Sequence, residues 1–172
     1  PVFPEIHLRL SATGSHYKNL VVLNRGEDII REALGAHLWG VGDQTLPGVM
    51  GVRLRESGLK LAVAESCTGG MIAGAITGAS GSSDYFVLGA VTYADDAKIS
   101  VLGVNRGTIL RHGAVSRQAV EEMSAGVMRL SGAHVTAAVS GVAGPAGGTR
   151  EKPVGSVHIA VRFGDRLHDE EH

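Results

Sequence analysis

Residues 61–70, LAVAESCTGG, constrain the fold of this chain more than any other stretch. An apolar run typical of a buried strand ends in a hydroxyl, a thiol, a second hydroxyl and two glycines, and a helix-like pattern follows. The strand places Ser66 at its carboxyl end, and the glycines allow backbone amides to approach a ligand or a developing oxyanion. Small residues at such a turn also serve tight packing, so a reactive and a structural interpretation both stay open.

The length and charge of the chain limit its class. Its 172 residues suffice for one well-buried domain with a small appended piece, and 16 basic residues nearly balance 17 acidic ones. This balance argues against binding to nucleic acid or a membrane surface, so we expect a small-molecule partner. Apolar runs are too short to cross a bilayer, no signal peptide is visible, and the single cysteine cannot form an internal disulfide. These features favour a cytoplasmic protein.

The first forty residues differ in pattern from the rest. Residues 4–14 alternate apolar and polar side chains, which predicts a peripheral, half-exposed strand. From about Leu20 the apolar spacing predicts a helix closed by Gly35, and a linker with a boundary near Gly40 follows. We therefore expect a short α+β segment over residues 1–40 and the main domain over residues 41–172.

Four apolar segments of the main domain predict strands that are buried on both faces. They are residues 61–64, 86–93, 133–140 and 154–163. A helix with Pro47 in its first turn and Gly58 after its end is expected before them, and Ser116 is expected to cap another helix between them. Strands alternating with helices predict an α/β domain, which we expect to be a three-layer α/β/α sandwich around a mostly parallel or mixed sheet.

Three reactive side chains follow the ends of predicted strands, where open α/β sheets hold their ligands. Ser66 needs a neighbouring base to act as a nucleophile, and Lys98, if kept neutral, supplies one, with Tyr93 relaying a proton or orienting the lysine. Either Tyr93 or Lys98 is then the general base. The alternative is a tyrosine at the sheet rim and a solvated lysine.

Cys67 competes with Ser66 for the role of nucleophile, because a thiolate is intrinsically more reactive. Successive side chains at a strand end point to opposite faces, so the two should not share one pocket. A buried structural thiol is the commoner role of a lone cysteine. We therefore favour Ser66.

The segment SGVAGPAGGTREKPVG, residues 140–155, is rich in glycine and carries Arg150 and Lys152. It predicts a loop that encloses a ligand with phosphate or carboxylate groups, although it matches neither the Walker nor the dinucleotide pattern and a plain surface turn is the alternative. Histidines at 112, 134 and 158 lack metal-site spacing, and Asp95 with Asp96 suits a helix start. We expect no metal and no cofactor.

Five motifs, AESCTGG, GSSDYF, VTYADDAK, GAVS and SGVAGPAGGTREKPVGSV, occur in an order that resembles the carboxyl-terminal domain of CinA-type competence/damage-inducible proteins. The resemblance implies a nicotinamide-nucleotide amidohydrolase, which converts nicotinamide mononucleotide to nicotinate mononucleotide and ammonia. It implies catalytic roles for Ser66, Tyr93 and Lys98. The substrate-binding residues that it implies are Thr68, Gly69, Gly70, Ser140, Gly141, Gly144, Gly147 and Gly148, with Ser140 standing where the family often has threonine.

The resemblance also bears on the ends of the chain and on its assembly. Residues 1–40 resemble the tail of a middle domain that follows a pyrophosphatase-like domain, and the family continues beyond His172 through a further strand and a long helix. A homodimer is expected. Two alternatives to the enzyme stay open, namely a regulatory module that binds a nucleotide without catalysis and a mainly structural role in assembly.

Overall fold

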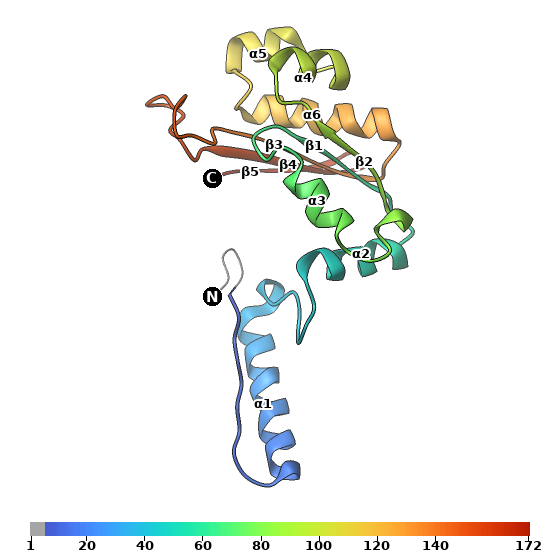
Figure 1. Ribbon diagram of the computed structural model, residues 1–172, viewed down its shortest axis with the longest axis vertical. Coiled ribbons are helices and arrows are strands. Elements are labelled where there is room, and N and C mark those ends of the chain that lie inside the picture. Colours follow the sequence, from blue (N-terminus) through green and yellow to red (C-terminus); the bar gives the residue numbers. More distant parts are fainter. Residues whose placement is uncertain (1–5) are drawn as a thin grey trace. The chain divides into compact units, whose positions relative to one another are not determined.

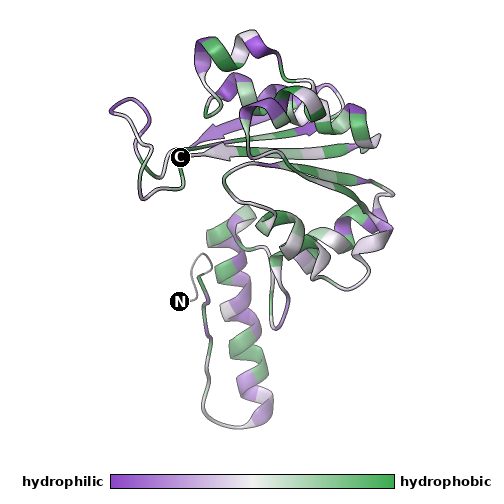
Figure 2. Cartoon of the chain, turned by 45° about the horizontal axis from the view of Figure 1, so that its top comes forward, coloured by the Kyte–Doolittle hydropathy of each residue, from purple (hydrophilic) through white to green (hydrophobic). Residues whose placement is uncertain are grey.

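The computed structural model describes residues 6–172, and the chain divides into two compact units, Pro1–Gln44 and Thr45–His172. In the first unit, α1 (His16–Leu34) is followed by a short 3-10 helix, η1 (Gly35–His37) (Figure 1). The predicted helix is thus confirmed, and Gly35 follows its end with a positive φ of 51°. None of the α1 residues is buried, and hydrophilic and hydrophobic residues intermix along the helix (Figure 2).

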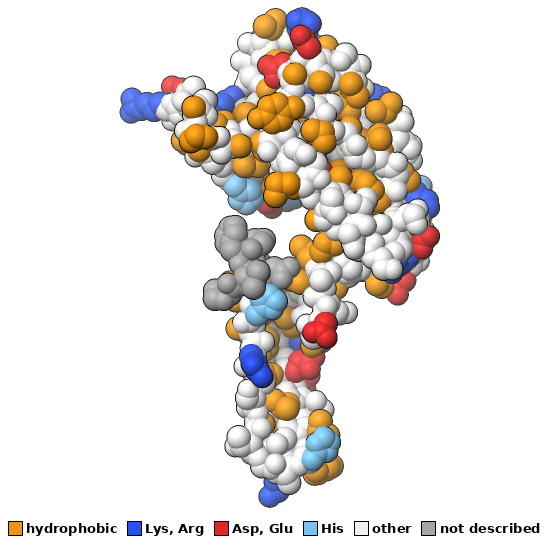
Figure 3. Space-filling view, viewed as in Figure 1, with side chains coloured by type: hydrophobic (Ala, Val, Ile, Leu, Met, Phe, Trp, Pro, Cys, Tyr) orange, Lys and Arg blue, Asp and Glu red, His pale blue; other side chains and the backbone are white. Residues whose placement is uncertain are grey.

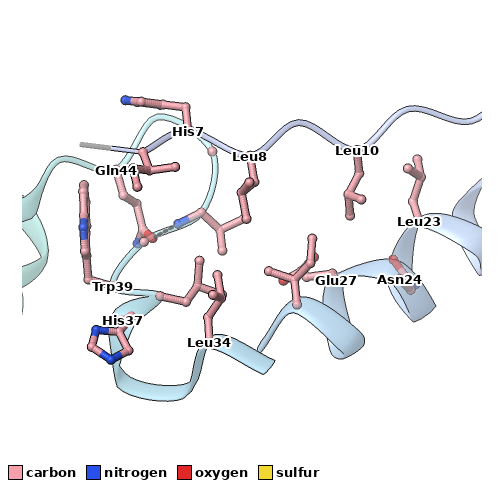
Figure 4. Close-up of a pocket in the computed structure, with 16 residues that line it drawn as sticks. His7, Leu8, Leu10, Leu23, Asn24, Glu27, Leu34, His37, Trp39 and Gln44 are labelled. Carbon is pink, nitrogen blue, oxygen red and sulfur yellow. Dashed lines mark hydrogen bonds between the residues drawn. The ribbon is translucent and has the colours of Figure 1, made fainter. Parts of the chain in front are cut away.

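The peripheral strand predicted over residues 4–14 is wrong for the described part of that range. Residues 6–13 have no regular secondary structure, and residues 4 and 5 lie outside the described residues. Leu8 and Leu10 instead line a pocket of about 650 Å³ with side chains of α1, among them Leu23 and Leu34 (Figure 4). The alternating residues therefore pack against a helix and not beside another strand, since apolar contacts alone do not specify a ladder.

The second unit contains a sheet whose strands, within residues 6–172, have the order β2 (Phe86–Val91), β1 (Leu61–Glu65), β3 (Val135–Gly141), β4 (Val157–Phe163) and β5 (Arg166–Glu171). β1 pairs in parallel with β2 and β3, whereas β3 with β4 and β4 with β5 are antiparallel. The predicted α/β class with a mixed sheet is confirmed. The elements are α2 (Leu46–Glu56), β1 (Leu61–Glu65), α3 (Met71–Thr77), η2 (Ser82–Asp84), β2 (Phe86–Val91), α4 (Asp95–Leu102), α5 (Arg106–His112), α6 (Arg117–Ser131), β3 (Val135–Gly141), β4 (Val157–Phe163) and β5 (Arg166–Glu171).

Helices cover both faces of this sheet (Figure 1). α6 packs on one face together with α4 and α5, which we call the α6 side, and α3 packs on the other with α2, which we call the α3 side. Ala62 and Ala64 of β1 join the core on the α6 side, while Leu61 and Val63 join the core on the α3 side. β1, an interior strand of the sheet, is therefore buried on both faces, and its consecutive residues alternate between two cores.

Other expectations for the main domain hold in part. Pro47 lies in the first turn of α2, and Ser116 caps α6 by accepting a hydrogen bond from the Ala119 amide at 3.2 Å, both as predicted. The prediction of burial on both faces is wrong for two strands. β2 is an edge strand whose residues alternate between half-buried and exposed, and in β4 Val161 and Phe163 are exposed. β5 was not predicted, since its sequence, RLHDEE, is polar enough to lie at the opposite edge.

Candidate functional site

The end of β1 places Ser66 in a buried turn before α3. The Ser66 amide donates to Val139 O of β3 at 3.1 Å, which continues the parallel pairing by one residue, and only 7% of the serine is exposed. The turn then reverses through Gly69 and Gly70, whose φ angles are 58° and 99°. Residues other than glycine rarely adopt such positive φ angles, so the two glycines allow the chain to turn shortly after the serine.

Lys98 reaches Ser66 from α4, on the α6 side of the sheet. Its Nζ lies 3.1 Å from Ser66 Oγ, and it donates to the carbonyl oxygens of Thr92 at 3.0 Å and Tyr93 at 2.9 Å. Only 1% of the lysine is exposed. The structure thus brings together two of the predicted residues that are 32 positions apart.

The surroundings of Lys98 favour its neutral form. Burial lowers the pKa of the Lys98 ammonium, and the charges of Asp95 and Cys67 offset only part of that effect. Asp95 Oδ1 is 3.9 Å from Nζ but is itself largely exposed, so solvent weakens the pair. In a neutral amine the two N–H groups satisfy the two carbonyl oxygens, and the lone pair then faces the Ser66 hydroxyl.

Tyr93 contributes its backbone to this site. Its carbonyl oxygen accepts from Lys98, whereas 70% of the residue is exposed. Across residues 6–172 the Tyr93 hydroxyl has no hydrogen-bond partner, so the phenol is not joined to the Ser66–Lys98 pair as the prediction required. β2 ends at Val91 and α4 begins at Asp95, and this corner allows Lys98 to reach the carbonyl oxygen of Tyr93, five residues before it.

Glu65 is a polar residue of the site that the sequence analysis did not select. It is fully buried, and its carboxylate accepts from the amides of Gly70, Ile72 and Ala73 at the start of α3. Burial alone raises the pKa of this carboxyl, but the Thr68 side chain and the three amides together hold the pKa below its ordinary value. The sequence did contain a signal for this role. Glu65 shortly precedes two glycines and the start of a predicted helix, where an acidic side chain is favourable.

The contacts of Glu65 reduce the number of amides that can serve as the predicted oxyanion donors. The Gly70 amide is engaged by Glu65, and the Gly69 amide donates to Ser66 O at 3.1 Å. Among the described residues, the amides of Cys67 and Thr68 have no oxygen acceptor, and the buried Thr68 hydroxyl makes no well-formed hydrogen bond although it influences Glu65. Of the amides predicted as oxyanion donors, Thr68 to Gly70, only that of Thr68 therefore stays available, and the Cys67 amide joins it.

Cys67 is a half-buried thiol next to the serine. Burial raises the pKa of the Cys67 thiol, and the amides of Cys67 and Thr68 and the charge of Lys98 offset this only in part. A raised pKa reduces the thiolate fraction, which is the reactive form. The electrostatics therefore favour Ser66 over Cys67, in line with the sequence argument.

Ser140 and Gly141 lie beside the turn but differ in what they offer a ligand. The Ser140 hydroxyl is buried and donates to Ala114 O at 2.8 Å, which ties β3 to the loop before α6. At Gly141 a Cβ atom would come within 3.1 Å of Cys67 Sγ and 2.8 Å of Ser156 O, so the β3 end passes close to the serine turn. This close approach explains the glycine.

The rest of the glycine-rich loop joins β3 to β4. Gly144 and Gly148 pack against Val154 within the loop, and a Cβ atom added at Gly147 would have none of the described atoms within 4 Å. Lys152 Nζ donates to His112 O at the end of α5, where a cation is favourable for the helix dipole. For Gly144 and Gly148 the neighbours nearest to a Cβ position are thus residues of the same loop.

Two of the three histidines considered in the sequence have side-chain partners, since His158 Nε2 also lies 3.9 Å from Glu171 Oε1. His134 Nδ1 accepts from the Lys60 amide at 2.9 Å, and within residues 6–172 no three His, Cys, Asp or Glu side chains are arranged to hold a metal ion.

Across residues 6–172, none of the helices combines the length and apolar character needed to span a bilayer. Hydrophobic side chains nevertheless reach the visible surface of both units (Figure 3).

Comparison with known proteins decides the family. The family model of the CinA C-terminal domain matches residues 43–172. The chain belongs to the CinA family. A CinA-like protein from Geobacter metallireducens is 44% identical over 160 residues, which cover 92% of this chain and 39% of that protein. A CinA-like protein from Thermotoga maritima is 41% identical over 172 residues, covering 94% of this chain and 41% of that protein.

Solved structures of the CinA superfamily share the fold. A competence/damage-inducible protein from Agrobacterium tumefaciens has a TM-score of 0.69 and 41% identity, over 77% of this chain and 83% of that one. A CinA superfamily protein from Escherichia coli has a TM-score of 0.73 and 30% identity, over 81% of this chain and 84% of that one. The chain spans about two-fifths of the length of the curated relatives described above.

Proposed function

We propose that this CinA domain hydrolyses the carboxamide of nicotinamide mononucleotide, giving nicotinate mononucleotide and ammonia, with Ser66 as the nucleophile. The observation that carries the proposal is the buried contact of 3.1 Å between Ser66 Oγ and Lys98 Nζ. A serine beside a lysine whose charge is disfavoured is a nucleophile paired with its base. The resemblance to nicotinamide-nucleotide amidohydrolases supplies the substrate.

The reaction takes two steps. Lys98 accepts the Ser66 proton as Oγ bonds to the carboxamide carbon, and the resulting ammonium returns that proton to the nitrogen as the carbon–nitrogen bond breaks and ammonia leaves. Water then attacks the acyl-enzyme ester, with Lys98 again accepting a proton, and restores the Ser66 hydroxyl. The proton transfer that starts the reaction joins two groups already in hydrogen-bond contact.

The amides of Cys67 and Thr68 are the candidate oxyanion donors. They precede α3 in the turn and, among the described residues, donate to no oxygen; they interact with the Cys67 sulfur, a weaker acceptor that a developing oxyanion would replace. A donor of this kind typically contributes about a hundredfold or more to the rate. The glycine-rich loop between β3 and β4, with Arg150, is proposed to face the nucleotide phosphate.

The test is ammonia release from nicotinamide mononucleotide by the wild type, Ser66→Ala and Cys67→Ala. We expect Ser66→Ala to remove activity and Cys67→Ala to retain most of it, with circular dichroism unchanged in both. The cysteine variant is a matched control, because it alters the adjacent position in the same turn.

The outcomes separate the alternatives. An active Ser66→Ala protein contradicts covalent catalysis by this serine, and loss of activity only in Cys67→Ala assigns the nucleophile to the thiol. Nucleotide binding by calorimetry without ammonia release in the wild type supports the regulatory binding module instead. Light scattering over a range of concentrations tests the expected homodimer separately.

A further inference from the structure

Glu65 carries a buried charge that neither proposed step uses. It is the last residue of a central strand, none of its surface is exposed, and it directly precedes Ser66. Burying an isolated carboxylate is costly unless hydrogen bonds compensate for the lost water. The compensating contacts of Glu65 therefore indicate what the charge does.

The Thr68 side chain contributes to this compensation, and the well-formed hydrogen bonds of the carboxylate are with the start of α3. Glu65 Oε2 accepts from the Gly70 amide at 3.0 Å and the Ile72 amide at 3.2 Å, and Oε1 accepts from the Ala73 amide at 2.8 Å. The first amides of a helix lack partners within the helix, and here the protein's own side chain supplies them. The positive end of α3 is thus occupied by Glu65.

The same contacts close a ring around the serine turn. The main chain runs from Glu65 through Ser66 to Gly70, and the carboxylate bridges back from Gly70 to Glu65. Within this ring the Gly69 amide bonds to Ser66 O, and the Ser66 amide bonds to Val139 O. The turn is therefore fixed to the neighbouring strand, to itself and, through Glu65, to α3.

Alternation along the strand separates the two functions. Glu65 faces the α3 side, whereas Ser66 faces Lys98 on the α6 side. We propose that Glu65 is a positioning residue, whose carboxylate holds the turn so that Ser66 Oγ stays in contact with Lys98 Nζ. This role rests on the proposed serine chemistry but does not depend on the identity of the substrate.

A positioning role predicts a specific kinetic pattern. Orientation of the serine matters for bond formation, while substrate binding uses other groups, so kcat should fall with little change in KM. A displacement of about 1 Å at a reacting group can cost about a hundredfold in rate. A general loss of stability would instead lower the amount of folded protein and leave kcat per folded molecule unchanged.

The experiment compares Glu65→Gln, Glu65→Asp and Ala75→Gly with the wild type. Glu65→Gln keeps the shape but turns an NH₂ group toward amide donors, and Glu65→Asp keeps the charge on a shorter side chain. Ala75→Gly is the matched control, because a glycine at this exposed position weakens α3 without touching the carboxylate. Each protein is assayed for kcat, KM and melting temperature, and for the rate at which a small fluorophosphonate labels Ser66.

We expect Glu65→Gln to lower both kcat and the labelling rate about tenfold or more, with KM within about twofold. Glu65→Asp should recover part of the loss, and Ala75→Gly should label at the wild-type rate. Wild-type labelling rates in both Glu65 variants, or equal losses in Glu65→Gln and Ala75→Gly, would overturn the proposal.

The labelling assay separates this inference from the proposed function. A wild-type chain that is labelled at Ser66 but releases no ammonia loses its proposed substrate, while the labelling rates of the variants still decide the role of Glu65. A wild-type chain that the fluorophosphonate does not label at Ser66 overturns both.

Discussion

The two sides of the sheet treat a buried ionisable group differently at the end of β1. On the α3 side, three amides meet the Glu65 carboxylate, and its pKa lies below the ordinary value despite burial. On the α6 side, Lys98 meets two carbonyl oxygens and a hydroxyl, and burial lowers its pKa. One environment stabilises the charged form, and the other disfavours it.

This difference separates a structural charge from a reactive one. A group held firmly in its charged state is suited to fixing geometry, whereas a group whose charged and neutral forms are closer in free energy is suited to moving a proton. Two neighbouring positions, Glu65 and Ser66, direct these environments to opposite sides of one strand. Substitutions on the two sides should therefore differ in what they change.

Replacing Lys98 should have the largest effect. Lys98→Met retains the length of the side chain but cannot accept the serine proton, so we expect kcat/KM for ammonia release to fall about a hundredfold or more. In the wild type, kcat/KM should rise with pH through the lowered lysine pKa. Activity of Lys98→Met near the wild-type level would remove the basis of the contrast.

The two groups should also give opposite pH dependences of stability. Because the pKa of folded Lys98 is lowered, the unfolded chain binds more protons, and the free energy of unfolding should rise with pH until the unfolded value of about 10.5 is passed. The free energy of unfolding of Lys98→Met should therefore exceed that of the wild type most at low pH, and the difference should shrink as pH rises.

The lowered pKa of Glu65 gives a contribution that is present above about 4.5 and lost as pH falls through the folded pKa. Glu65→Gln should cost about 1–3 kcal/mol at neutral pH and less in acid. Urea unfolding of the wild type, Lys98→Met and Glu65→Gln, repeated from acid to alkaline pH, measures how the free energy of unfolding of each protein changes with pH. Parallel curves for wild type and variants would show that neither group is perturbed.

A pair of glycines sharpens the comparison through packing. At Gly126 of α6 a Cβ atom would overlap the carbonyl oxygen of Leu102, the last residue of α4, whereas at Gly74 of α3 no such contact exists among the described atoms. Gly126→Ala should cost about 1–3 kcal/mol and reduce activity, because α4 carries Lys98. Gly74→Ala should stabilise by about 0.5–1 kcal/mol. Chemical denaturation measures both, and equal effects would contradict the packing argument.

The smallest effect on activity is expected at Tyr93. Tyr93→Phe removes the phenol but keeps the carbonyl oxygen that accepts from Lys98, so kcat/KM should fall by no more than about tenfold. A loss as large as that of Lys98→Met would show that the phenol joins the site when substrate binds. Steady-state kinetics on the two variants side by side decide between these results.

Much of the fold follows from local patterns in the sequence. The apolar run before Ser66, the serine cap of α6 and the proline in α2 each have a short-range physical cause, and the structure contains each of them. Strand β5 was missed because a polar edge strand has little apolar signal. Residues 6–13 were wrongly predicted to form a strand, because alternation alone does not supply a partner strand.

The candidate site was predictable in its residues more than in its contacts. The position of Ser66 at a strand end and of Lys98 shortly after the next strand followed from the α/β pattern, and the 3.1 Å contact agrees with it. The engagement of the Gly70 amide by Glu65 depends on side-chain direction across the turn, which residue spacing does not specify. Residue spacing likewise does not specify that the Tyr93 side chain is exposed.

The antiparallel turn from β3 to β4 has a consequence for how selectivity can vary. Because β4 runs back from the edge at which β1 ends, the connecting hairpin lies at the serine edge of the sheet while contributing little to either core. If the hairpin faces the nucleotide as proposed, insertions or exchanges in it would alter which molecule is accepted without rebuilding the scaffold. Reactivity and preference would then reside in separable stretches of one polypeptide.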